Sequence, residues 1–238
     1  MPIKLEFKRS INNKSFLFCL ATVLLSFILG YILLVSLDKV ENVTINQLFF
    51  SVYTVMAQLG TMIFSIVIIH SINSDYKEKN ILFYKSMRIT PQKYFLMKII
   101  VMIFWFSTSI IVSTLGVCLL YNDIDKFGIM FNYFENVIVY IVLITSLFAF
   151  LFENVIGAFC SNLAVWIFSI VVLTISPNLK LIAFFDASNE VYNNLDKFIS
   201  TGNYTYVSWD LWKYNLLIFI MVFILVNIFS KRWIKNGI

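Results

Sequence analysis

Residues Phe16 to Leu37 read FLFCLATVLLSFILGYILLVSL, a stretch without a single charged side chain. A helix rises about 1.5 Å per residue, so about 20 apolar residues cross the roughly 30 Å hydrocarbon core of a bilayer. Five further stretches meet the same length, at Phe49 to His70, Tyr94 to Tyr121, Ile129 to Phe152, Val155 to Ile175 and Leu211 to Ser230. The sequence therefore predicts an all-α polytopic membrane protein with six transmembrane helices.

The composition fits a chain that lies almost wholly in the bilayer. Of its 238 residues, 60% are hydrophobic and 13% are charged, against about 25% charged in ordinary soluble domains. We expect one transmembrane domain, residues 1–238, and no separate soluble core. The first apolar stretch exceeds the roughly 7–15 apolar residues of a signal peptide, and no small-x-small site follows it, so we expect it to remain as an anchor.

Positive charge is concentrated on alternate connections. Thirteen of the eighteen basic residues belong to the N-terminus, the connection between the second and third spans, and the C-terminus. The positive-inside rule places these segments in the cytoplasm, so both termini are predicted to be cytoplasmic. The abundance of Phe, Ile, Asn and Lys is typical of an AT-rich bacterial genome, which indicates the plasma membrane of a bacterium.

The segments between the spans carry further helical patterns. In residues 1–15, Ile3, Phe7 and Ile11 recur as on one face of an amphipathic helix at the inner leaflet, although the alternation of Ile3, Leu5 and Phe7 leaves a short strand open. Residues 74–89 are predicted to form a cytoplasmic helix. Its expected N-cap is Asp75 with Glu78 as the N3 partner, and Thr90 and Pro91 then begin the third span.

The outer segment 176–210 is predicted to contain two short extracellular amphipathic helices. The apolar residues of the first are Leu179, Ile182 and Phe185; those of the second are Val191, Leu195 and Phe198, with Gly202 as the residue that ends it.

No catalytic, cofactor or metal site is predicted, and no nucleic-acid partner. The scattered glycines form no phosphate-binding G-x-x-x-x-G-K-[ST] loop. The single histidine, His70, lacks the Cys or acidic neighbours of a metal site, and we interpret it as a helix-end residue that reaches the interface. The three cysteines, Cys19, Cys118 and Cys160, each lie alone within a span, which favours a packing role.

Three polar residues within the spans are candidates for a translocation path, namely Gln58, Glu135 and Asn162. Polar and charged groups are costly in hydrocarbon and therefore face the bundle interior or a cavity. The alternatives are an interfacial carboxylate for Glu135, and hydrogen bonds between helices for Gln58 and Asn162.

Residues Asp75 to Lys98, DYKEKNILFYKSMRITPQKYFLMK, carry a resemblance to a known family. The chain resembles the membrane subunits of type-2 ABC exporters, in the branch of lantibiotic-immunity and peptide-exporting permeases. A charged helix after the second span, a Thr-Pro turn and a lysine inside the third span are the shared features. The basic opening Leu5 to Ser10 and the six-span layout agree with it. One departure is the absence of a glycine near Lys79 or Asn80.

This resemblance implies a permease that works with other chains. Residues 74–89 would be the coupling helix that docks into separate ABC ATPase subunits, which would bind ATP and Mg²⁺. A second permease subunit, identical or paralogous, would complete the transporter, and the substrate would be an amphipathic or antimicrobial peptide or a lipid-like molecule. The docking residues implied are Asp75, Tyr76, Lys77, Glu78, Lys79, Phe83 and Arg88.

Other interpretations remain open on the sequence alone. The basic residues of 74–89 would also suit a solvated loop that contacts anionic membrane lipid. The chain could be a non-transporting membrane sensor or immunity protein that binds a peptide or lipid at the outer leaflet. An intramembrane enzyme is disfavoured because the spans lack clustered His, Glu or Asp.

Overall fold

The computed structural model describes residues 2–176, 179, 181–187 and 189–235, and within these ranges it contains helices and no strand. Six helices are long and apolar enough to cross a membrane, so the predicted fold class is confirmed. The helices are α1 (Pro2–Asn12), α2 (Ser15–Ser36), α3 (Ile45–Lys77), α4 (Asn80–Ser86), α5 (Pro91–Tyr121), α6 (Phe127–Leu151), α7 (Val155–Ile175), α8 (Glu190–Thr201) and α9 (Leu211–Lys235), with short 3-10 turns at Ile124–Lys126 and Tyr204–Tyr206.

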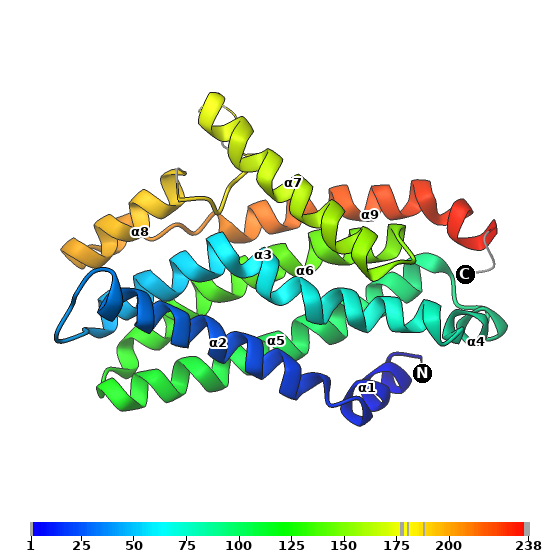
Figure 1. Ribbon diagram of the computed structural model, residues 1–238, viewed down its shortest axis with the longest axis horizontal. Coiled ribbons are helices and arrows are strands. Elements are labelled where there is room, and N and C mark those ends of the chain that lie inside the picture. The colour runs from blue at the N-terminus through cyan, green and yellow to red at the C-terminus, as the bar shows by residue number, and fades with distance from the viewer. Residues whose placement is uncertain (1, 177–178, 180, 188, 236–238) are drawn as a thin grey trace.

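The long helices run side by side as an elongated bundle (Figure 1). One end of the bundle, which we call the α4 end, carries α1, α4 and both chain termini. The other end carries α8 and is called the α8 end. The N-terminal segment is helical, which decides against the alternative of a short strand.

Helix α6 is the centre of the bundle. It packs against α3, α5, α7 and α9. Of the residues in the most apolar 18-residue stretch of this span, 78% are buried, against 17% in the corresponding stretch of α7. Edge-to-face aromatic contacts join α6 to α3: the ring of Phe49 lies 5.4 Å from that of Phe134, and Tyr53 lies 5.5 Å from Tyr133. Since α7 covers little of the bundle, most of its own surface is left to face lipid or another chain.

Helix caps account for where several spans begin. Thr90 caps α5 by accepting a hydrogen bond from the Lys93 backbone N–H, and Pro91 is the first residue of the helix, as predicted. Helix α3 begins at Ile45, four residues before the predicted span, because Thr44 and Gln47 form a reciprocal capping box.

The structure corrects the predicted start of the helix at residues 74–89. Helix α3 continues through Asp75 to Lys77, and a separate helix, α4, begins at Asn80. Asp75 is therefore not an N-cap. Lys79 makes the turn between the two helices at a φ of 58°, in the left-handed region that favours glycine. A lysine thus occupies a backbone conformation that glycine adopts more readily.

In the outer segment, one predicted helix is confirmed and the other is wrong. Helix α8 buries Val191, Leu195 and Phe198 and ends at Gly202, whose φ is 69°. Residues 181–185, in the first expected helix, form turns, while Pro177 lies outside the described residues. The ring of Phe184 stacks on Tyr214 at 4.1 Å, and the Tyr214 hydroxyl donates to the Leu181 carbonyl oxygen. These contacts with α9 hold the segment as a turn.

The three cysteines differ in exposure. Cys19 and Cys118 are buried, as expected of packing residues, but Cys160 is exposed on α7. The interpretation of Cys160 as a buried packing residue is therefore wrong. The reason is that α7 packs against the bundle along only a small part of its surface.

Gly30 permits a close approach between α2 and α3. A Cβ atom at this position would lie 2.8 Å from Val52 Cγ2 and 3.0 Å from the Val52 backbone nitrogen. The Ser51 hydroxyl donates to the Gly30 carbonyl oxygen at 2.8 Å across the same contact. Small residues allow such backbone contacts between helices in membranes.

We expect Gly30→Ala to destabilise the bundle by about 1–3 kcal/mol, because the added methyl group forces α2 away from α3. Thermal unfolding of the purified protein in detergent measures this change. Gly116→Ala is the matched control, since no atom lies within 4 Å of the Cβ position there. The control should be neutral or more stable by up to about 1 kcal/mol, and equal destabilisation by both changes would contradict the packing account.

Candidate functional site

The α4 end presents an exposed surface of apolar and charged side chains, which we call the α4 tip and define as residues 77–88. Leu82 and Phe83 on α4 are 52% and 57% exposed. Ile81 and Tyr84 on the opposite side of α4 are buried and anchor the short helix. The exposed charged residues around the apolar pair are Lys77, Glu78, Lys79, Lys85 and Arg88.

Hydrogen bonds fasten the end of α3 to the end of α6. The Tyr76 hydroxyl donates to the Phe150 carbonyl oxygen at 3.0 Å, and the Asn73 side-chain amide donates to the Phe152 carbonyl oxygen at 3.0 Å. The last carbonyls of a helix have no hydrogen-bond partner within that helix, so these bonds satisfy carbonyl oxygens that would otherwise be unpaired. They fix the helix that carries the α4 tip to the centre of the bundle.

Directly behind the α4 tip lies a group of four charged side chains, which we call the charge cluster: Glu6, Arg9, Asp75 and Lys98. Lys98 Nζ lies 2.5 Å from Glu6 Oε1 and 2.7 Å from Asp75 Oδ2. Arg9 forms an ion pair with Asp75 and a second one with Glu78, at 3.0 Å. Asp75, Lys98 and Glu6 are buried. The cluster therefore joins α1, α3 and α5 through charges that balance one another.

Two tyrosines complete the hydrogen bonding of the cluster. The Tyr94 hydroxyl donates to Asp75 Oδ2 at 2.8 Å, and the Tyr84 hydroxyl donates to Glu6. Burial, followed by the nearby Glu6 carboxylate, raises the pKa of the Tyr84 phenol above its ordinary value, so the phenol keeps its proton and acts as a donor. Through Tyr84, the buried side of α4 is bonded to α1.

Helix α1 is also held by contacts of its own. The Trp105 indole N–H donates to the Ser10 hydroxyl at 2.8 Å, and the ring of Phe7 lies 5.1 Å from that of Phe104. Burial of the Arg9 guanidinium opposes its charge, but the Asp75 carboxylate outweighs this and raises the pKa of Arg9 above its ordinary value. Arg9 therefore stays charged within the cluster.

The cluster changes which residues can meet a partner chain. Asp75, predicted as a docking residue, is fully buried, and its carboxylate binds Lys98, Arg9 and Tyr94. It cannot form part of an exposed docking surface in this conformation. Tyr76 is partly buried, and the other predicted docking residues, Lys77, Glu78, Lys79, Phe83 and Arg88, are exposed together on the α4 tip.

Glu6 and Arg9 are the residues that the sequence analysis missed. A signal was present: Asp75 and Lys98 are opposite charges placed at the same ends of neighbouring spans, and such charges pair with one another. Glu6 and Arg9 are three residues apart, so they share one face of α1.

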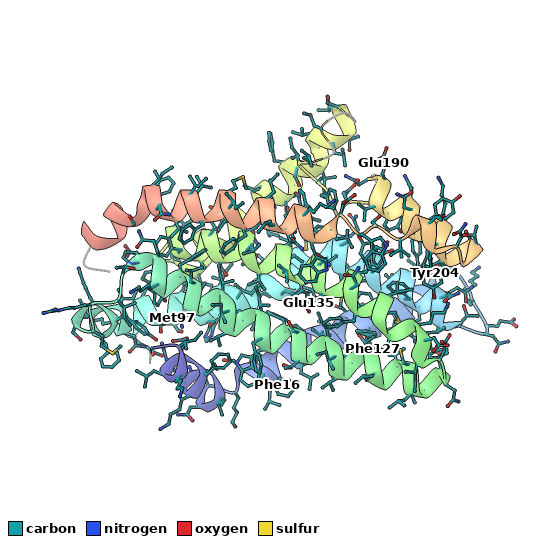
Figure 2. The ribbon with its side chains drawn as sticks, turned by 180° about the vertical axis from the view of Figure 1, so that it is seen from behind. Phe16, Met97, Phe127, Glu135, Glu190 and Tyr204 are labelled. Atoms are coloured by element: carbon teal, nitrogen blue, oxygen red, sulfur yellow. The ribbon has the colours of Figure 1, made fainter. Side chains whose placement is uncertain are left out.

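The three intramembrane candidates each have a partner of their own. Gln58 donates to Asp186 of the outer segment at 3.2 Å, and Asn162 on α7 donates to Thr145 on α6 at 3.1 Å. Glu135 on α6 accepts a hydrogen bond from Ser107 on α5, while its second oxygen has no partner among the described residues. Figure 2 shows Glu135 within the bundle, between Met97 and Tyr204. Among the described residues, no hydrogen bond joins the three to one another.

Comparison with known proteins identifies the family. The sequence profile of the Peptide export permease protein YydJ family matches residues 3–238. The chain belongs to the YydJ family of peptide export permeases. It is also 36% identical over 242 residues to the probable peptide export permease protein YydJ of Bacillus subtilis (strain 168), an alignment that covers 99% of this chain and all of the relative. No solved structure matches the chain.

Membership in the YydJ family agrees with the six spans: the chain is a multi-pass membrane protein of a permease family. Within the described ranges there is no group of three or more His, Cys, Asp or Glu residues that could hold a metal ion. The charge cluster behind the α4 tip joins three helices of this YydJ-family chain through paired charges.

We expect Lys98→Met to destabilise the protein by about 3–5 kcal/mol, because it leaves Asp75 and Glu6 as buried acids with too little positive charge. Chemical or thermal unfolding in detergent measures the loss. Lys213→Met provides the control. Lys213 lies 2.6 Å from Asp210, but both side chains are largely exposed, at 83% and 73%. Its loss should leave stability almost unchanged, because water screens an exposed ion pair, and similar effects of the two changes would argue against a desolvated cluster.

Proposed function

We propose that this chain is the non-catalytic transmembrane permease subunit of an ATP-driven peptide exporter, and that ATP is hydrolysed in a separate ATPase chain docked at the α4 tip. The family supports export of peptides by a permease. The observation that carries the docking proposal is the exposure of Leu82 and Phe83, by more than half, on a short helix at one end of the bundle.

The chemistry of the α4 tip fits a protein partner. An exposed apolar pair ringed by charged residues is the pattern of an interface, with an apolar centre and a polar rim. The buried side of α4 is held by Tyr84 and the charge cluster, so a force applied at the tip reaches α1, α3 and α5 together. We propose Tyr76, Lys77, Glu78, Lys79, Phe83 and Arg88 as the ATPase-docking residues.

A second permease subunit, identical or paralogous, forms part of the same proposal. Helix α7 supports a second subunit, because only 17% of the residues in its most apolar stretch are buried within this chain. Within one subunit, Gln58, Glu135 and Asn162 each bond to a different partner. We therefore place the translocation path between two subunits and not within one. The proposed substrate is an amphipathic or antimicrobial peptide, moved out of or off the membrane.

The docking proposal predicts the effect of removing the apolar pair. Leu82→Ala/Phe83→Ala should abolish co-purification of the ATPase chain and its stimulation by the permease, while the permease itself remains folded, since both side chains are exposed. Pull-down with mass spectrometry, together with ATPase assays in nanodiscs, measures both effects.

The matched control is Leu119→Ala/Leu120→Ala, a pair that is 62% and 81% exposed near the opposite end of α5. This control should retain the ATPase. Absence of any ATPase from the wild-type sample would reject the exporter and favour a stand-alone sensor or immunity protein. Loss of the ATPase from both variants would reject docking at the α4 tip.

The proposed orientation, with both termini and the α4 tip in the cytoplasm, has its own test. Ser86→Cys and Asn203→Cys place exposed thiols at the α4 and α8 ends. An impermeant maleimide added to intact cells should label Asn203→Cys and should label Ser86→Cys only after permeabilisation. The reverse pattern would invert the topology and remove the docking proposal.

A further inference from the structure

A cavity of about 450 Å³ lies beneath the junction of α1 and α2, and we call it the α1 cavity. Its walls come from α1, the first turn of α2, the last turns of α3 and the inner turns of α5. Its volume falls in the range of about 300–1,000 Å³ that is typical of small-molecule sites. Glu78 of the α4 tip lies at its edge, and the intramembrane residues Gln58, Glu135 and Asn162 do not line it.

The walls change from apolar to polar along the bundle. Phe18, Ile66, Val67 and Met102 line the part nearer the middle of the spans. The part nearer the α4 end is lined by polar and charged residues: Glu6, Arg9, Ser10, Asn13, Ser15, His70, Ser71, Ser74, Glu78 and Lys98. On α3 the lining residues run from Ile66 to Ser74, eight residues or about 12 Å. This matches the passage from hydrocarbon to headgroups in one leaflet.

The cavity is bordered by side chains that face the bilayer. Phe18 on α2 and Ile66 on α3 line it and are 59% and 60% exposed. Both lie on membrane-spanning helices, so the cavity borders the hydrocarbon on this side, which is where a lipid chain would enter. An amphipathic molecule that enters this way meets apolar walls with its tail and polar walls with its head.

The polar wall offers hydrogen-bond donors to an anion. Its two cations are already paired, Arg9 with Asp75 and Glu78, and Lys98 with Glu6 and Asp75. Asn13, Ser15 and His70 have no side-chain partner among the described residues, and each can donate to a phosphate oxygen. The exposed basic residues Lys4, Lys8 and Lys14 flank the same region, and such residues draw anionic headgroups to the membrane surface.

We propose that the α1 cavity binds one glycerophospholipid from the leaflet at the α4 end. Its phosphodiester group lies against Asn13, Ser15 and His70, and an acyl chain leaves between Phe18 and Ile66. A lipid is favoured over a peptide because the volume is too small for a folded peptide and the walls follow the polarity of a single leaflet. The bound lipid fills the cavity beside the ion pair of Arg9 and Asp75 and so supports the charge cluster from its open side.

Native mass spectrometry of the full-length chain, with any co-purified partners, provides the first test. The protein is released from nanodiscs of phosphatidylglycerol and phosphatidylethanolamine and is then stripped with increasing detergent. We expect one phospholipid to remain after the annular lipids are lost. Glycerol 3-phosphate added alone should not displace it, because the site also requires the acyl chain. Displacement by glycerol 3-phosphate would mean a simple phosphate site and would overturn the lipid proposal.

Two variants test the position of the site. Val67→Trp fills the apolar part of the cavity and should remove the retained lipid. Asn13→Leu/His70→Leu removes two donors and should lower the apparent affinity by about tenfold. The control is Ile224→Trp, at a residue that is 53% exposed on α9, and it should keep the lipid. Equal retention in all four proteins would reject the α1 cavity as the site.

Photo-crosslinking of the wild-type protein keeps the proposal testable if a variant does not fold. A phospholipid with a diazirine near its headgroup should attach to peptides that contain residues 13–18 or 66–74. Attachment to other segments only, or retention of a peptide in place of the lipid, would overturn the proposal. Neither result depends on the ATPase or on transport, so failure here leaves the proposed exporter function unaffected.

Discussion

The ion pairs of Asp75 and Lys98 are the constraint on which the α4 end depends. Both side chains are buried, and a buried charge is tolerated only when it is paired and hydrogen-bonded. The charge of Lys98 is therefore balanced by both Glu6 of α1 and Asp75 of α3, and the charge of Asp75 is balanced by both Arg9 and Lys98. As a result, α1 cannot leave the bundle, and α3 cannot end early, without exposing a charge to an apolar environment.

At the α4 end, prediction succeeded where local chemistry decides the structure and failed where these ion pairs decide it. The spans follow from the lengths of the apolar stretches, and Thr90 with Pro91 defines the start of α5 by local chemistry alone. Asp75 followed by Glu78 has the spacing of an acidic capping pair. The spacing cannot reveal that a lysine of the next span lies opposite Asp75 and keeps this residue within α3. The correct answer depends on a tertiary contact across 23 positions of sequence.

In the outer and intramembrane regions, too, features set by nearby residues were predictable and features set by contacts between distant residues were not. The end of α8 was predictable because Gly202 readily adopts the left-handed conformation. The turn at residues 181–185 was not, because it depends on the stacking of Phe184 on Tyr214. Asn162 and Thr145 bond across α7 and α6, as polar groups in hydrocarbon tend to do. The sequence indicated the need for such a partner and could not identify it.

The length of α3 has a mechanical consequence. Its 33 residues span about 50 Å at 1.5 Å per residue, whereas the hydrocarbon core is about 30 Å thick. The helix therefore extends well beyond the apolar layer and acts as a rigid lever with the α4 tip at its far end. A tilt of roughly 10° about its midpoint moves that end by about 4 Å, a distance that follows from the helix rise alone.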